Sequence, residues 1–166
     1  GKNKTESLFF KSKDYYENNG IKVLLKHRAI KLNTKKQEAI LEDGSSIKYE
    51  KLVIATGSKL KTITSKEHKK IIYLNTLSKA IDLQKQLKES KSIGVVGAGY
   101  IGLEVAATAN KMGLKTTVFE AEKRIMQRSA SKEIANFIKS YHEKMGVELK
   151  LNTTVERIEP KDHRVN

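Results

Sequence analysis

The segment from Ser92 to Glu120 restricts the possible folds of this chain more than any other part. It consists of an apolar run, the turn Gly-Ala-Gly-Tyr-Ile-Gly at 97–102, an alanine-rich run that stops at Gly113, a second apolar run and a closing acid. Apolar runs of strand length on either side of a helical pattern predict a βαβ unit built on a parallel sheet. The expected fold class is therefore α/β.

The glycines of this turn have the spacing Gly-x-Gly-x-x-Gly, which is typical of a Rossmann-like dinucleotide-binding domain. Gly97 allows the tight turn, Gly99 lets a pyrophosphate approach the backbone, and Gly102 lets the helix pack closely on the strand. Free N–H groups and the dipole at the helix start favour a diphosphate. The glycines alone are weak evidence, but strand, helix and acid in register make nucleotide binding the expected function of the turn.

The closing acid, Glu120, is placed to accept hydrogen bonds from ribose hydroxyl groups. Its negative charge would repel a 2′-phosphate, so NADH is favoured over NADPH, although the neighbouring Lys123 and Arg124 weaken that preference. A second acid, Glu104, lies in what we expect to be the first helical turn, where the helix dipole alone would explain it. The four histidines have no metal-ligand spacing, so no metal site is expected.

The charge balance is strongly basic, with 33 Lys and Arg against 19 Asp and Glu and a formal net charge of +14. Such a balance favours an anionic partner. Aromatic residues make up only 6% of the chain and do not alternate with basic ones, so we expect no nucleic-acid partner. Cysteine is absent, which excludes a redox-active thiol pair. We also expect no membrane partner and a cytoplasmic protein, because no apolar run has the length of a membrane span or a signal-peptide core.

Around the βαβ unit, turn and cap signals divide the chain into further elements. The patterns predict a helix from Ser12 to Asn19 with a glycine stop, a helix that Thr76 caps, and a helix at 131–145. Strands are expected at 21–25, 29–32, 39–41, 47–49, 51–57, 147–151 and 155–158, and several of them form an antiparallel β-meander.

Two passages share one pattern, because residues 15–25 match residues 141–151 as a helix end, a glycine and an apolar run. Chance similarity of two helix-to-strand passages is the alternative to a true repeat. In a repeat, the meander that follows the first copy would be cut off in the second. Exchange of the first meander between two copies would then close the nucleotide domain, so a homodimer is one expected state.

The segments 49–57 and 97–104 together resemble the middle of the two-dinucleotide flavoprotein reductases, the pyridine nucleotide-disulfide oxidoreductase superfamily. Within it, the segments 73–77 and 124–142 are most similar to the ferredoxin and rubredoxin reductases. The resemblance implies two domains. Residues 1–61 would be a partial FAD-domain segment with the helix, the meander and the Ala-Thr-Gly strand, and residues 62–166 an NAD(P)H-binding domain truncated at its second meander.

The resemblance also implies roles for individual residues. Ala55, Thr56 and Gly57 would contact FAD, and Ala29 would lie at its adenine. The remaining positions implied for NADH, besides the three glycines and Glu120, are Tyr100 in the turn, Ile101 at the nicotinamide end, Glu104 at the carboxamide and Arg128 at the adenosine ribose.

The implied function is part of an FAD-dependent NADH oxidoreductase that passes electrons from NADH through flavin to an acidic iron-sulfur or rubredoxin acceptor. The cofactors would carry the chemistry and the protein would position them, so no catalytic side chain is expected. The first FAD-binding glycine motif of the family is absent from this chain, which therefore would not complete a flavin site alone. The alternative is a non-catalytic NAD-binding or partner-binding module, which yellow colour and diaphorase activity would argue against.

Overall fold

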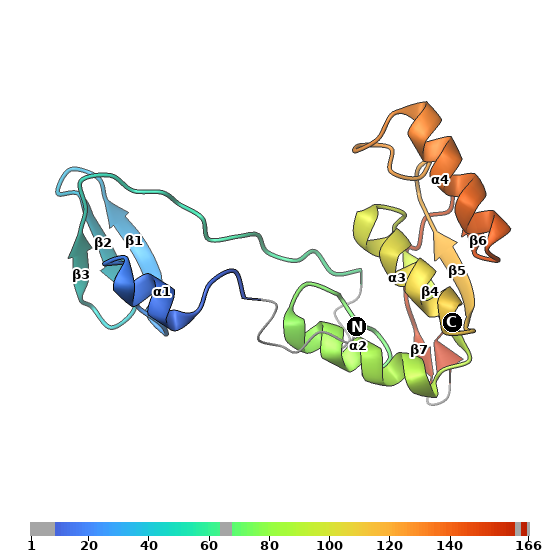
Figure 1. The fold of residues 1–166 in the computed structure, drawn as a ribbon, viewed down its shortest axis with the longest axis horizontal. Coiled ribbons are helices and arrows are strands. Elements are labelled where there is room, and N and C mark those ends of the chain that lie inside the picture. The colour runs from blue at the N-terminus through green and yellow to red at the C-terminus, as the bar shows by residue number, and fades with distance from the viewer. Residues whose placement is uncertain (1–8, 64–67, 162–163, 166) are drawn as a thin grey trace. The chain divides into compact units, whose positions relative to one another are not determined.

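A computed structural model describes residues 9–63, 68–161 and 164–165 of the chain. The chain forms two compact units, Gly1–Gly57 and Ser58–Asn166, and the elements of both are labelled in Figure 1. The first unit contains a short helix and an antiparallel sheet, and the second contains a parallel sheet with helical connections. The α/β fold class is therefore confirmed.

The first unit begins with helix α1 (Lys13–Asn18), and the hydroxyl of Ser12 caps it by accepting a hydrogen bond from the Tyr15 N–H at 3.3 Å. The predicted meander is confirmed as the three-stranded antiparallel sheet of β1 (Ala29–Asn33), β2 (Glu38–Leu41) and β3 (Ser46–Lys48), in that order. The turn between β2 and β3 contains Gly44 at φ +84°, the left-handed conformation that the Asp-Gly sequence signal predicts.

Two predicted strands of the first unit, 21–25 and 51–57, are wrong, because the structure gives neither segment regular secondary structure. Their side chains are exposed, with Leu25 at 76% and Val53 at 86%. Apolar strands of this kind belong to sheets that cover them on both faces. No described strand pairs with either segment, so their apolar character alone does not make them strands.

The second unit is built on a parallel sheet of β4 (Ser92–Val96), β5 (Lys115–Phe119) and β6 (Glu148–Lys150), with β5 in the centre. Helix α3 (Tyr100–Lys111) connects β4 to β5, and α4 (Lys132–Lys144) connects β5 to β6. Helix α2 (Leu77–Glu89) precedes the sheet, and the hairpin of β7 (Pro160–Lys161) and β8 (Arg164–Val165) follows it. The predicted βαβ unit is thus confirmed.

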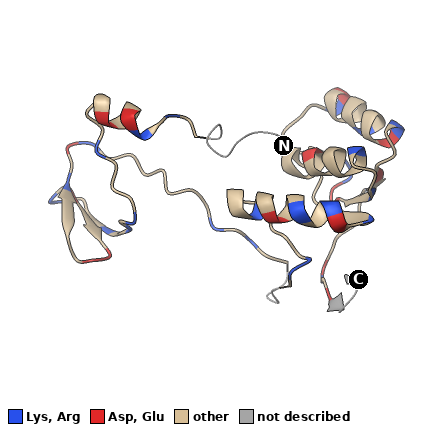
Figure 2. Cartoon of the chain, turned by 60° about the horizontal axis from the view of Figure 1, so that its bottom comes forward, with Lys and Arg blue, Asp and Glu red and all other residues tan. Residues whose placement is uncertain are grey.

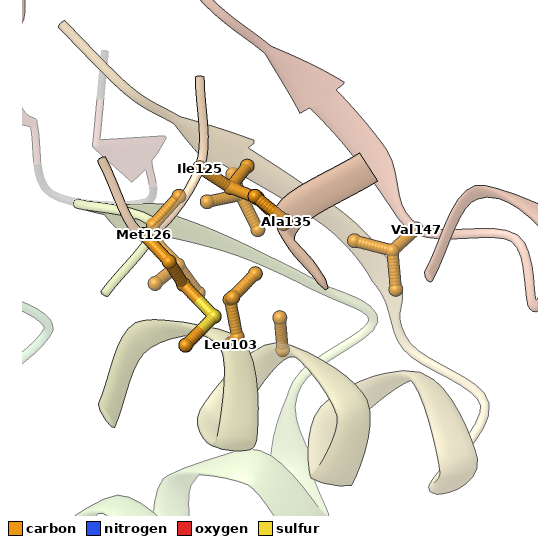
Figure 3. Packing of buried hydrophobic residues seen from close by; sticks show 9 residues of the cluster. Leu103, Ile125, Met126, Ala135 and Val147 are labelled. Atoms are coloured by element: carbon orange, nitrogen blue, oxygen red, sulfur yellow. The ribbon is translucent and has the colours of Figure 1, made fainter. Parts of the chain in front are cut away.

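The core of the second unit lies between the two crossover helices and the parallel sheet (Figure 3). Leu103 of α3 and Ala135 of α4 pack in one buried cluster with Val118 of β5, which has no exposed surface. Ile125 and Met126, from the loop after β5, also belong to this cluster. A smaller cluster of Leu87, Ala109 and Leu114 joins α2 to α3. The loop after β5 is therefore fixed by the same core that fixes the sheet.

The predicted Thr76 cap of α2 is confirmed, and Ser131 caps α4 in the same way. The hydroxyl of Thr76 accepts the Lys79 N–H at 3.3 Å, and the hydroxyl of Ser131 accepts the Ile134 N–H at 3.3 Å. The strand predicted at 155–158 is wrong, because this segment has no strand partner among the described residues. After this segment the described chain forms the short β7–β8 hairpin.

Charged residues of both signs are interspersed along the helices (Figure 2). The helix α4, for example, carries the ion pair between Lys139 and Glu143 at 3.1 Å. This distribution agrees with the sequence, in which the excess of lysine is spread along the chain rather than confined to one segment. Within the described part of the chain, none of the helices combines the length and the apolar character that crossing a membrane requires.

Candidate functional site

The glycine-rich turn connects β4 to α3 and has the conformation that its sequence predicts. Gly97 adopts φ +99°, which favours glycine, and its N–H donates to the carbonyl oxygen of Phe119 at 2.8 Å. A Cβ atom on Gly102 would overlap the carbonyl oxygen of Gly97. Gly97 therefore needs glycine for its backbone conformation, and Gly102 needs it for the close approach of helix and strand.

Gly99 differs from both, because neither its backbone conformation nor its protein neighbours require glycine. It is the N-cap of α3 with ordinary backbone angles of φ −81° and ψ −174°, and no side chain caps the helix there. A Cβ atom on Gly99 would meet no protein atom within 4 Å. The space beside this residue is open, at a helix N-terminus where backbone N–H groups favour an anion. The turn accordingly fits the diphosphate of a dinucleotide.

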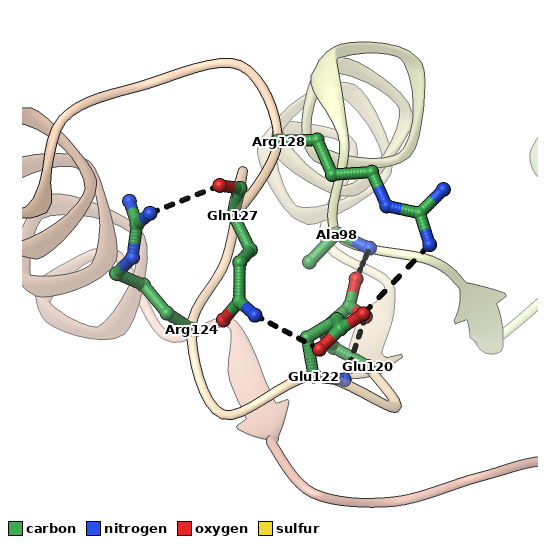
Figure 4. A network of polar contacts seen from close by, with 6 residues as sticks. All are labelled: Ala98, Glu120, Glu122, Arg124, Gln127 and Arg128. Carbon is green, nitrogen blue, oxygen red and sulfur yellow. Dashed lines mark hydrogen bonds and ion pairs between the residues drawn. The ribbon is translucent and has the colours of Figure 1, made fainter.

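The carboxylate of Glu120 closes the site at the end of β5 (Figure 4). Its Oε2 accepts the N–H of Ala98 at 2.6 Å, and its Oε1 accepts the N–H of Glu122 at 2.9 Å. Each carboxylate oxygen has two acceptor positions, so each retains one for a further donor such as a ribose hydroxyl. Glu120 thus holds the glycine-rich turn and can still bind a ligand.

Ala98 is completely buried and is held at both of its backbone polar groups. Besides the N–H that Glu120 accepts, its carbonyl oxygen accepts the Met126 N–H at 2.9 Å. Met126 has φ +50°, a left-handed conformation that is uncommon for a residue with a long side chain. The turn, the acid and the loop after β5 therefore meet at one residue.

The predicted site residues of α3 lie at the exposed start of the helix. Tyr100 and Ile101 are 57% and 60% exposed, and the Tyr100 hydroxyl donates to the carbonyl oxygen of Ser129 at 3.3 Å. Glu104 is exposed and is the fifth residue of α3, so its expected place in the first helical turn is wrong. The simple helix-dipole explanation of this acid is correspondingly weaker, because the dipole acts over the first turn.

The loop at 121–131 contains polar contacts that sequence reasoning missed (Figure 4). Glu122 Oε2 accepts a hydrogen bond from Gln127 Nε2 at 3.0 Å. Glu122 Oε1 forms an ion pair with Arg128 Nη2 at 3.8 Å. The guanidinium group of Arg124 donates to three backbone carbonyl oxygens, those of Gln127, Ala130 and Ser131, at 2.9 to 3.0 Å. The acidic and basic residues in the sequence were a signal for ion pairs here, but their partners depend on the path of the loop.

The four residues that the resemblance assigned to FAD all lie in the first unit. Ala29 begins β1 and pairs with Leu41 of β2. The segment 55–57 does not lie at the end of a strand, as the sequence had predicted, and its residues are exposed. Gly57 adopts φ +73°. These residues therefore belong to a different unit from the turn at 97–102, and their role toward FAD stays a prediction.

Outside the glycine-rich turn, the described residues form a groove but no metal-binding cluster. No group of three or more His, Asp or Glu side chains that could hold a metal occurs among the described residues. A groove of about 300 Å³ lies elsewhere, between α2 and the segment before it, where Lys79, Asp82 and His68 contribute to its lining. The glycine-rich turn is the stronger candidate site than this groove, because its backbone geometry matches that of known diphosphate-binding turns.

The comparison with protein families agrees with this geometry, because the model for pyridine nucleotide-disulphide oxidoreductases matches residues 2–166. The chain belongs to this family. Rubredoxin-NAD(+) reductase of Pseudomonas putida is 34% identical over 158 residues, which cover 94% of this chain and 41% of that protein. Putidaredoxin reductase of the same organism is 32% identical over 160 residues, which cover 93% of this chain and 38% of that protein.

Solved structures of pyridine nucleotide-disulphide oxidoreductases are similar over the same extent. A ferredoxin reductase from Rhodopseudomonas palustris matches with a TM-score of 0.88 and 28% identity, over 99% of this chain and 41% of that one. The reductase in a covalent putidaredoxin reductase–putidaredoxin complex matches with a TM-score of 0.89 and 31% identity, over 99% and 40%. This chain thus spans about two fifths of the length of its relatives.

The cofactors expected from the resemblance are confirmed at the level of the family, whose members bind NAD(H) and FAD. One similar structure, a water-forming NADH oxidase from Lactobacillus brevis, has NADH bound and matches with a TM-score of 0.84 and 25% identity, over 98% of this chain and 38% of that one. Members of this oxidoreductase family also transfer electrons to rubredoxin or putidaredoxin, as the names of the relatives state.

Proposed function

We propose that this chain supplies the NADH-binding unit of an FAD-dependent oxidoreductase that passes electrons to a ferredoxin- or rubredoxin-type acceptor. The observation that carries the proposal is the open space at Gly99, which lies at an uncapped helix start beside the carboxylate of Glu120. When bound, NADH would supply a hydride and FAD would accept it. The side chains of this chain would bind and orient the nucleotide.

In this proposal the parts of the nucleotide lie along the start of α3. The diphosphate binds at Gly97, Gly99 and Gly102, and the adenosine ribose donates to the free acceptor positions of Glu120. Ile101 and Glu104, both exposed on α3, extend toward the nicotinamide. Tyr100 borders the diphosphate, and Arg128 approaches the adenosine ribose. The proposal further assigns Ala29 and the segment 55–57 to FAD in the complete enzyme.

The electron acceptor belongs to the same proposal. Relatives named as reductases of rubredoxin and of ferredoxins support a small electron carrier as the partner. The net charge of +14 would attract an acidic carrier and raise the rate of encounter at low salt. Reduction of the carrier by NADH and the flavin-loaded complete enzyme should therefore slow as ionic strength rises. A rate that does not depend on salt would contradict an acidic acceptor.

The substitution Gly99→Ala tests nucleotide binding directly. The added methyl group meets no protein atom within 4 Å, so the variant should fold with unchanged thermal stability. The methyl group would occupy the space through which the diphosphate approaches the backbone, and we expect NADH affinity to fall at least about tenfold. Calorimetric titration of this chain with NADH measures the change.

Gly94→Ala is the matched control, because it adds the same methyl group to a glycine of β4 at 3.4 Å from the Phe119 ring, away from the open side of the turn. This control should bind NADH as the unmodified chain does. Absence of NADH binding by the unmodified chain would refute the proposed function. Equal loss in both variants would show that the sheet, and not the turn, is responsible.

A further inference from the structure

One face of α4 carries an apolar stripe that extends along the whole helix. Four large side chains form this stripe, with exposed fractions of 54% for Ile134, 72% for Phe137, 58% for Tyr141 and 56% for Met145. They follow one another at intervals of three or four residues, so they lie on one side of the helix. Single exposed apolar residues are ordinary on a protein surface, but a contiguous patch of this kind is typical of an interaction site.

The stripe is distinct from the face with which α4 packs on the sheet. On that face Ala135 and His142 are 1% and 8% exposed, and Ile138 packs against the main core cluster. None of the four stripe residues belongs to this cluster or to the groups packed against it. The core of the second unit therefore explains one apolar face of α4 and leaves the other one exposed.

Two charges of opposite sign lie beside the stripe, one at each end. Glu133 and Lys144 are exposed and are about three helical turns apart, so they share one flank of the helix. Neither has an ion-pair partner among the described residues. Glu133 interacts with its own N–H and with Ser131 at the helix start, and the helix dipole favours both charges. The dipole accounts for these two signs but not for the apolar residues between them.

The stripe is complementary to itself when two copies of α4 lie antiparallel. A two-fold axis at the middle of the helix would place Phe137 opposite Tyr141 of the second copy. The same axis would place Ile134 opposite Met145 of the second copy to within one residue. Aromatic side chains would therefore meet at the centre of such a pair, where a contact between proteins gains most of its affinity.

We propose that the apolar stripe of α4 is the interface of a two-fold symmetric dimer, in which α4 packs antiparallel against α4 of a second copy of this chain. A two-fold rotation that reverses the helix keeps each flank on its own side of the pair. Glu133 of each copy would thus meet Lys144 of the other, which is the charge complementarity that favours a second copy as the occupant. In a parallel pair the two flanks would lie on opposite sides, and these charges would not meet.

The size of the stripe and the charge of the chain set the expected strength of this dimer. Helix α4 has 13 residues and is about 20 Å long, so the interface belongs to the small end of specific contacts. The net charge of +14 on each copy opposes association, and salt screens this repulsion. We expect a dissociation constant of roughly 0.1 mM at about 0.15 M NaCl, and weaker association at lower salt.

Sedimentation equilibrium of this chain measures the dissociation constant, and Phe137→Glu tests the stripe. The variant introduces two carboxylates at the centre of the interface, one from each copy, and should raise the dissociation constant at least about tenfold. Its thermal unfolding should be unchanged, because Phe137 is largely exposed. Phe10→Glu is the matched control, since it makes the same substitution at a residue of the first unit that is 99% exposed. This control should dimerise as the unmodified chain does.

The antiparallel order is tested by reversing the charges at the ends of the stripe. Glu133→Lys and Lys144→Glu each place like charges opposite each other in the dimer, so each variant alone should dimerise more weakly than the unmodified chain. In an equimolar mixture of the two variants, both contacts would again join opposite charges. Native mass spectrometry of the isotope-labelled mixture should show the mixed dimer favoured by about fivefold or more over the two homodimers.

Three results would overturn the inference. The first is an unmodified chain that stays monomeric up to about 1 mM, which would leave the stripe to a different protein. The second is a dimer that persists in Phe137→Glu, because another surface, such as the exchanged meander, would then hold it together. The third is the absence of any preference for the mixed dimer, which would exclude the antiparallel pairing of Glu133 with Lys144.

Discussion

The two passages that share a sequence pattern have different structures, and the difference shows what a strand needs. Both have a helix with an i,i+4 ion pair, Lys13–Glu17 at 3.2 Å in α1 and Lys139–Glu143 at 3.1 Å in α4. Both helices are followed by a glycine with positive φ, +66° at Gly20 and +95° at Gly146. After Gly146 the chain forms β6, whereas the matching segment after Gly20 forms no strand.

The cause of this difference is the neighbouring strand rather than the local sequence. β6 pairs in parallel with β5, and Val147, the residue just before β6, is 3% exposed within the main core. Ile21, the matching residue, is 46% exposed. Parallel strands are stable only when neighbours and covering helices bury them. Helix ends and glycine stops are local features, so they appear in both passages.

The largest effect should come from a core truncation in the second unit. Ile125 has no exposed surface, and Ile125→Ala should lower the free energy of unfolding by about 2–5 kcal/mol. Urea unfolding followed by circular dichroism at the helix band measures this change. Ile54→Ala in the first unit removes the same atoms from a residue that is 68% exposed, and it should have almost no effect. A similar loss of stability in both variants would contradict the difference in burial between the two units.

A smaller effect should appear as a pH dependence at His142, whose counterpart in the first passage is Tyr16. Burial lowers the pKa of His142 from its ordinary value of 6.5, because desolvation penalises the charged ring. The unfolded chain therefore binds this proton more readily than the folded one. Stability should be complete above about pH 6.5 and should decline as the pH falls through 6.5 and then through the lower pKa of the folded state.

Urea midpoints at pH 7.5 and pH 5.5 measure this dependence. His142→Phe should reduce it, since the substituted ring cannot take up a proton. His27→Gln is the control, because His27 lies on the exposed surface of the first unit. If His27→Gln reduced the dependence as much as His142→Phe, burial of His142 would not be its source. The carboxylate of Glu148, whose pKa is lowered mainly by the Thr117 hydroxyl, contributes at lower pH.

The smallest effect should come from the ion pairs that the two passages share. Glu143→Gln should lower the free energy of unfolding by about 0.3–0.5 kcal/mol, because an exposed i,i+4 pair contributes little. Half of the effect or more should disappear in 1 M NaCl through screening. Glu17→Gln in α1 should leave the unfolding of the second unit unchanged. A cost above about 1 kcal/mol for Glu143→Gln would mean that this residue has a further role.

Much of the second unit could be predicted from the sequence. Local signals predicted α3 and α4, the glycine-rich turn and the parallel strands, because caps, glycines and apolar periodicity act over a few residues. The segments 21–25, 51–57 and 155–158 were predicted as strands from the same kind of signal. They are not strands, because strand pairing depends on partners that an apolar pattern does not specify.

The candidate site divides in a similar way. Gly97 and Gly102 are predictable because backbone geometry allows only glycine there, and the structure has the geometry that the motif implies. The bond from the Ala98 N–H to Glu120 and the contacts of Glu122 were not predictable. They depend on the path of the loop after β5, which the buried side chains of Ile125 and Met126 determine.

Because Ala98 is bonded to Glu120 through its N–H and to Met126 through its carbonyl group, the proposed contacts to the diphosphate and to the adenosine ribose would share one support. A displacement of Ala98 would then affect both contacts, even though different residues make them. A substitution in the 121–131 loop should therefore change the affinity even for nucleotide fragments that contain the diphosphate but lack the adenosine ribose. The energetic contributions of the turn and of the acid at this site are therefore not separate quantities that can be added.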